Sequence, residues 1–119
     1  MKPAPYDLEY YRGDTLSFVL VPTDKTGAPI DLTSATVRFI VATGRGDTPP
    51  AVPGYPSTIE CTASKISGNT KVQCIITKAN GLSMKAGTPY VYDVFIDIGG
   101  SVTTYLTGNI NVTERVVAP

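Results

Sequence analysis

YVYDVFIDIGGSVTTYLTGNINVT, residues 90–113, is the stretch that decides the fold of this chain. Apolar and polar residues alternate on both sides of Gly99-Gly100, and a period of two places the two sets on opposite faces of a strand. Paired glycines between such runs are typical of a tight hairpin turn, because both can adopt positive φ. We therefore predict a β-hairpin. Its second strand has an inward apolar face that includes Val102 and Leu106, and an outward face of Thr, Asn and Tyr.

Five further segments alternate in the same way, and turn residues separate them. Seven short strands with turn signals roughly every 8–12 residues are typical of an all-β sandwich. The long connections at 44–57 and 79–88 are expected to be loops, with one helical turn near Leu82. The N-terminal residues 1–6 are expected to form an extended arm, 7–113 the domain and 114–119 an extended tail. The further strands are expected at residues 7–11, 15–21, 36–43, 58–63 and 71–77.

The composition limits the classes of partner. The 119 residues hold ten basic and ten acidic side chains, so the net charge is zero. Proteins that bind nucleic acid usually carry a clustered excess of basic residues, which neutralises the phosphates. No segment has the length and apolarity of a membrane span, and residues 1–6 lack the apolar run of a signal peptide. We expect no nucleic-acid or membrane partner, and a protein made and assembled in the cytoplasm.

No constellation of catalytic or metal-binding residues is predicted. The chain has no histidine, which excludes a Ser-His-Asp triad and histidine metal sites. Asp93 and Asp97 share one strand face and could ligate Ca²⁺, but no third ligand is close in sequence, so solvated carboxylates are expected. We predict no catalytic residue, no cofactor and no metal, and hence no enzyme.

The two cysteines, Cys61 and Cys74, fall on the apolar faces of consecutive strands. A two-residue loop at Ser67-Gly68 would place them directly opposite each other and allow a cross-strand disulfide. The alternative is that both are small buried apolar residues, and this is favoured because nothing indicates an oxidising compartment.

Two Arg-Gly-Asp triplets occur, at residues 12–14 and 45–47. An exposed triplet of this kind is a candidate cell-adhesion ligand, whereas Gly and Asp are also ordinary turn residues. We expect turn chemistry at both places, and adhesion stays an alternative for Arg45-Gly46-Asp47 only.

Several turn and strand motifs together resemble a known family. They are Arg12-Gly13-Asp14-Thr15, Pro29-Ile30-Asp31-Leu32-Thr33, the strand Thr36-Val37-Arg38-Phe39, the run from Gly87 through Tyr90-Val91-Tyr92-Asp93-Val94, and Gly108-Asn109-Ile110-Asn111-Val112. This set is similar to the immunoglobulin-like domains of tailed-bacteriophage virion proteins, such as the N-terminal domain of baseplate upper proteins. The resemblance implies an immunoglobulin-like antiparallel β-sandwich of about seven strands. It carries no catalytic residues.

The resemblance and the surface residues together give a functional hypothesis. We expect a non-enzymatic structural component of a tailed-phage virion, docked in the tail or baseplate onto other virion proteins, with self-association as a further contact. Alternatives are a capsid decoration or head-stabilising protein, and a receptor- or carbohydrate-binding module with Tyr55 in its platform. Tyrosines with small polar neighbours are common at interfaces. The candidate interaction surface consists of Tyr55, Tyr105, Asn109, Asn111, Val116 and Val117.

Overall fold

The computed structural model describes residues 4–116 and shows an all-β protein, as predicted, with one short helix in this range. All seven expected strands are present, and a two-residue strand precedes them. The predicted helical turn near Leu82 is confirmed as α1, which Thr77 caps by accepting a hydrogen bond from the Asn80 backbone. The elements are β1 (Ala4–Pro5), β2 (Leu8–Tyr11), β3 (Leu16–Leu20), β4 (Ala35–Ala42), β5 (Thr58–Ile66), β6 (Lys71–Ile76), α1 (Lys78–Leu82), β7 (Pro89–Ile98) and β8 (Ser101–Thr113).

The predicted hairpin is confirmed as β7 and β8, the two longest strands. Ile98 lies opposite Ser101, so Gly99 and Gly100 alone form the turn. Their φ angles are 59° and 89°, in the left-handed region that favours glycine. The paired glycines therefore fix the register of the hairpin.

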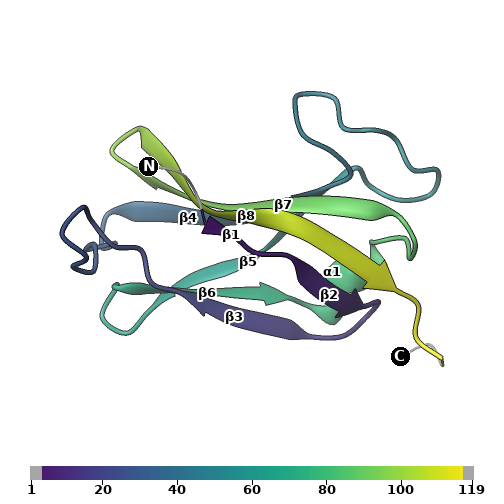
Figure 1. The fold of residues 1–119 in the computed structure, drawn as a ribbon, viewed down its shortest axis with the longest axis horizontal. Coiled ribbons are helices and arrows are strands. Elements are labelled where there is room, and N and C mark those ends of the chain that lie inside the picture. The colour runs from purple at the N-terminus through teal and green to yellow at the C-terminus, as the bar shows by residue number, and fades with distance from the viewer. Residues whose placement is uncertain (1–3, 117–119) are drawn as a thin grey trace.

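The strands form one mixed sheet that curls around the core. Its order is β8-β7-β4-β5-β6-β3, with β1 and β2 both beside β8. β5 is shared, because residues 58–61 pair with β4 and residues 62–66 pair with β6. Figure 1 shows the result, with β3 and β6 on one side of the molecule and β7 and β8 on the other.

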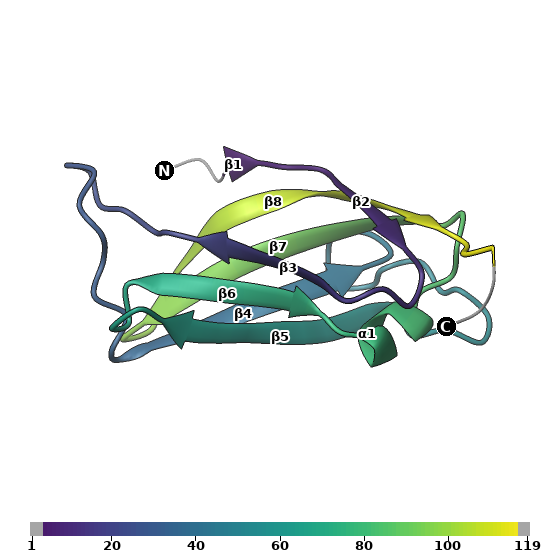
Figure 2. The ribbon, with the colours of Figure 1, turned by 90° about the horizontal axis from the view of Figure 1, so that it is seen from below.

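The first segment departs from the expected antiparallel arrangement. β1 and β2 pair in parallel with β8 at one constant offset, from Ala4 opposite Leu106 to Tyr11 opposite Thr113. The chain reverses directly from β2 into β3 through a turn in which Gly13 has a φ of 87°. β2 therefore runs with β8, and the prediction of a purely antiparallel sheet is wrong at this edge (Figure 2).

Three aromatic rings join the two sides of the core. Phe18 on β3, Phe39 on β4 and Tyr92 on β7 pack edge to face, with centroids 5.5 to 6.4 Å apart. Phe39 and Tyr92 are fully buried. Edge-to-face aromatic pairs contribute roughly 0.5–1.5 kcal/mol beyond the area they bury, so this cluster stabilises the packing of β3 against β4 and β7.

A β-bulge in β8 changes which residues face the core. Val94 lies opposite Leu106 but Phe95 lies opposite Thr104, so Tyr105 is the extra residue. The two faces exchange across the bulge, and Val102 is 58% exposed. The prediction that Val102 faces inward is wrong, because strict alternation cannot anticipate an inserted residue.

The cysteines do not face each other across the β5-β6 hairpin. The loop has four residues, 67–70, and Ser67 and Asn69 adopt φ of 55° and 62°. This longer loop shifts the predicted register by two residues, so Cys74 lies opposite Ala63. Both cysteines are free and buried, as in the alternative of small apolar residues.

We expect both thiols to be inert in the folded protein. Burial raises the pKa of Cys61 and of Cys74 to about 12, whereas the pKa of a thiol in an unfolded chain is about 8.5. The stability that the neutral thiols contribute is therefore fully present below the pKa of the unfolded chain. It is lost as the pH rises towards the pKa of the folded protein.

Alkylation followed by mass spectrometry should modify neither cysteine in native protein at pH 8 and both in guanidinium. Denaturant melts should show stability falling above pH 9, with a shallower fall in the double variant Cys61→Ala/Cys74→Ala. Rapid native alkylation of either residue would contradict the buried placement.

Candidate interaction surface

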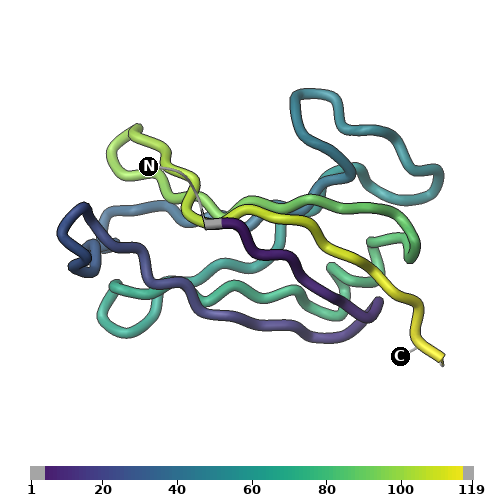
Figure 3. Tube along the Cα trace, viewed as in Figure 1, coloured from purple at the N-terminus to yellow at the C-terminus, as the bar shows by residue number. Residues whose placement is uncertain are grey.

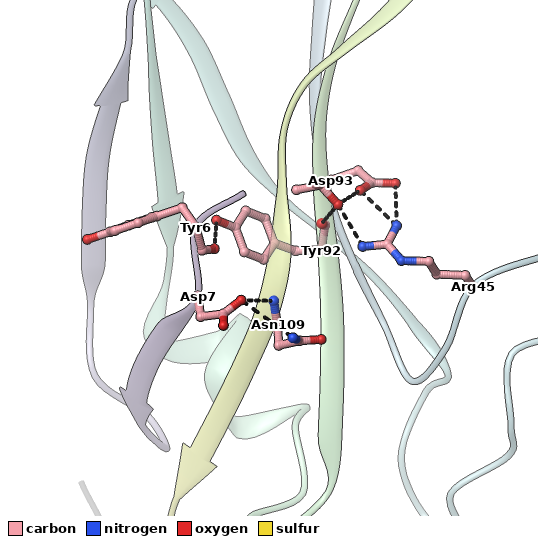
Figure 4. A network of polar contacts seen from close by, with 7 residues as sticks. Tyr6, Asp7, Arg45, Tyr92, Asp93 and Asn109 are labelled. Atoms are coloured by element: carbon pink, nitrogen blue, oxygen red, sulfur yellow. Dashed lines mark hydrogen bonds and ion pairs between the residues drawn. The ribbon is translucent and has the colours of Figure 1, made fainter. Parts of the chain in front are cut away.

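The chain's own first segment lies beside the edge of β8 and forms hydrogen bonds with two outward residues of that strand. The Asn109 backbone donates to the carboxylate of Asp7 at 3.0 Å, and the Asn111 side chain donates to Glu9 at 3.0 Å. Both asparagines stay exposed. Figure 4 shows the Asp7–Asn109 contact. These two residues of the predicted surface therefore hold β2 and the residues before it onto β8.

Between β1 and β2, the first segment approaches β8 closely at Gly108, where β8 has no side chain. The Tyr6 backbone donates to the carbonyl of Thr107 at 2.8 Å, and the Tyr92 hydroxyl donates to the carbonyl of Tyr6 (Figure 4). A Cβ on Gly108 would overlap that carbonyl. Burial raises the pKa of the Tyr92 phenol well above its ordinary value, so the hydroxyl remains a donor.

Residues 1–6 were expected to form an extended N-terminal arm, and the structure describes the second half of it. Residues 4–6 lie against the chain's own β8, and Tyr6 keeps a ring that is 55% exposed. Residues 1–3 lie outside the described residues. Within the described part of the arm, the backbone is used internally and the Tyr6 ring is what remains for a partner.

The loop between β4 and β5 is pinned to the sheet by one arginine. Arg45 donates to both carboxylate oxygens of Asp93, at 2.9 and 3.1 Å, and to the Thr107 hydroxyl at 2.7 Å. Thr107 in turn donates to Asp93 at 2.6 Å. The loop stands above the β7 side of the molecule (Figure 3). Asp93 is thus ion-paired rather than simply solvated, and the guanidinium of the second Arg-Gly-Asp triplet is already engaged.

A shallow groove of about 240 Å³ lies under this loop. Its floor is apolar, and the Arg45–Asp93 pair forms part of its wall. Small-molecule sites usually have volumes of roughly 300–1,000 Å³, so the groove is smaller than a typical ligand pocket. Its lining includes Ile40, Ala42, Pro49, Val91 and Phe95.

Tyr55, predicted as part of a binding platform, is half-buried at the base of the same loop. Its backbone donates to the carbonyl of Val52 at 3.0 Å, and the Arg12 guanidinium lies 6.0 Å from its ring centroid. Arg12 itself donates to the carbonyls of Leu82 and Met84, at 3.0 and 2.8 Å, at the end of α1. The first Arg-Gly-Asp triplet is therefore a turn that ties this end of the molecule together, as expected.

The remaining predicted surface residues are dispersed. Tyr105, the bulge residue, is half-buried and packs against the core. Val116 is fully exposed, and Val117 lies outside the described residues. Just before Val116, Arg115 pairs with Asp14, which ties the described part of the tail to the turn after β2. The structure thus brings only Asn109 and Asn111 together on one face.

Neither known families nor metal-ligating residues point to a further site in the described part of this chain. The chain matches no protein-family model, and no curated protein aligns with it significantly. Among residues 4–116, no cluster of three or more acidic or cysteine side chains could hold a metal ion. In the same range, no helix has the length and apolarity needed to cross a membrane.

Sequence reasoning missed the three residues that organise this surface, namely Asp7, Arg45 and Gly108. A glycine inside a strand pattern marks a bulge or a close backbone approach, so Gly108 carried a usable signal. Asp7 and Arg45 contact partners 102 and 48 residues away, and no local pattern encodes such pairs.

Replacing Gly108 by alanine should release the first segment, because its methyl group would overlap the Tyr6 carbonyl. We expect a loss of roughly 1–3 kcal/mol in unfolding free energy, typical of overpacking. Native-state hydrogen exchange should accelerate at the Tyr6 amide, which otherwise donates to Thr107. The matched control is Asn109→Ala, which keeps the backbone bond to Asp7. Unchanged exchange in Gly108→Ala would contradict the close approach of the Tyr6 carbonyl to Gly108.

Removing the Arg45 partner should free the loop and leave the sheet intact. Asp93→Ala is expected to raise hydrogen exchange and protease cleavage within residues 44–57. Its cost in stability should be below about 1 kcal/mol, because the pair is partly exposed. The control is Asp97→Ala, since within residues 4–116 Asp97 accepts a hydrogen bond only from the Gly100 backbone in the hairpin turn. Equal loop cleavage in both variants would show that the ion pair does not hold the loop.

Proposed function

We propose that this chain is an immunoglobulin-like β-sandwich that serves as a non-enzymatic structural component of a tailed-phage virion. The strand connections support the fold. β8, β7 and β4 lie together on one side, β6 and β3 lie on the other, and β5 passes between them. Such sandwiches have about seven strands in two packed sheets, with strands A, B, E and D in one sheet and C, F and G in the other.

The positions of the resemblance motifs carry the proposal. Gly13 supplies the turn into β3, and Asp31 accepts from both the backbone and the hydroxyl of Thr33 to form a tight corner. Leu32, within that corner, is fully buried. Tyr92 donates a hydrogen bond to the first segment, and Gly108 leaves room for that segment beside β8. Four of the five motifs therefore have a definite structural task, as expected of a pattern that defines a fold.

The proposed mechanism is passive docking onto other virion proteins in the tail or baseplate. The Arg45 bonds hold the 44–57 loop in one place, and a pre-ordered loop loses less conformational entropy on binding. Each contact is weak, and many copies acting together provide the strength. Capsid decoration on the head is the second location that fits the same scaffold.

Purified phage particles that encode this chain provide the test. Quantitative mass spectrometry should find the chain in a constant ratio to a known tail protein, and gold-labelled antibody should mark the tail or baseplate in electron micrographs. A non-structural phage protein from the same lysate is the control for carry-over. Labelling confined to the head would move the role to capsid decoration, and absence of the chain from particles would refute a virion role.

A further inference from the structure

β3 is an incompletely buried edge of the sheet. Leu16, Phe18 and Leu20 point towards the core, yet all three remain only half-buried. Every other described strand of four or more residues contains at least one buried residue. β3 is the last strand in the sheet order and pairs only with β6, so nothing covers its far side within residues 4–116.

The two edges of the sheet differ in how they resist pairing. Proteins protect free edges with charged residues and prolines, and the β1-β2 edge carries Pro5, Asp7 and Glu9, all exposed. Residues 15–21 contain neither a charge nor a proline. Val19 and Val21 on the outward face of that stretch are 52% and 42% exposed. The edge at β3 is therefore open to another strand, whereas the opposite edge is guarded.

We propose that β3 pairs antiparallel with β3 of a second copy of this chain, with Phe18 at the two-fold axis. A two-fold contact must be self-complementary. In this register Leu16 lies beside Leu20 of the other copy and Phe18 lies beside its counterpart, so the half-buried inward side chains cover one another. On the outward face, Ser17 lies beside the other copy's Val19. A backbone ladder joins the two sheets into one.

The open position beside β3 corresponds to a position that a strand occupies in the immunoglobulin sandwich. In the seven-strand form, strand A lies beside strand B, the position of β3. Here the first segment lies beside β8 instead, which leaves the place next to β3 open. This step rests on the proposed sandwich, whereas the exposure of β3 and the contrast between the edges do not.

The contact should be weak and concentration-dependent. Five paired residues span only about 17 Å, so we expect the contact to bury less than the roughly 1,600 Å² of a standard interface. The zero net charge of the chain adds little repulsion between copies.

Sedimentation velocity of the purified full-length chain over a concentration series tests the proposal. Wild type should show a reversible monomer–dimer equilibrium. Val19→Lys and Ser17→Lys should each raise the dissociation constant of the dimer by about tenfold or more, because a two-fold contact contains each substitution twice. Val102→Lys is the matched control, since Val102 is 58% exposed but lies beside the hairpin turn, and it should dimerise like wild type.

Circular dichroism and thermal melts check that each lysine variant is folded. A wild-type chain that stays monomeric at millimolar concentration would overturn the proposal. So would dimers that persist in both β3 variants, or a loss of dimer in Val102→Lys equal to theirs. Because the experiment uses only the purified chain, its failure would leave the virion proposal standing.

Discussion

Tyr92 is the residue on which the arrangement of this protein depends. Its ring packs edge to face with Phe39 on the neighbouring strand and with Phe18 across the core. Its hydroxyl passes beyond the core and donates to the Tyr6 carbonyl. One side chain therefore connects the far edge strand, the central hairpin and the first segment. The apolar ring and the polar tip act at opposite ends of the same residue, as is common for buried tyrosines.

The strand content was predictable because it depends on local alternation. The hairpin at Gly99-Gly100 could be placed to the residue, since only glycine adopts its two φ angles easily. Register was less accessible. The bulge at Tyr105 reversed the facing of Val102, and the four-residue loop after Ile66 moved Cys74 away from Cys61. One inserted or shifted residue changes everything beyond it, and alternation alone does not reveal where that happens.

The surface was predictable only in part, for a different reason. Asn109 and Asn111 are exposed as expected, yet their neighbours Asp7 and Glu9 arrive from the other end of the chain. Arg45 was expected in a turn, with cell adhesion as the alternative, and its actual partners lie on the hairpin. Long-range pairs of this kind depend on the completed sheet, so they can be identified only once the strand order is known. The polar residues of this face mainly fasten loops and ends to the sheet.

The parallel pairing of the first segment with β8 also has a mechanical consequence. The molecule is 44 Å long, and the described chain begins beside the middle of β8, with Ala4 opposite Leu106, and leaves at the C-terminal end of β8 (Figure 1). A pull between these two points would slide β1 and β2 along β8, so that the backbone bonds of this ladder share the load at the same moment. Such shear loading resists force far better than peeling, in which bonds break one after another. The same short segment that forms one edge of the sheet thus places the ladder with β8 under shear when the domain is pulled.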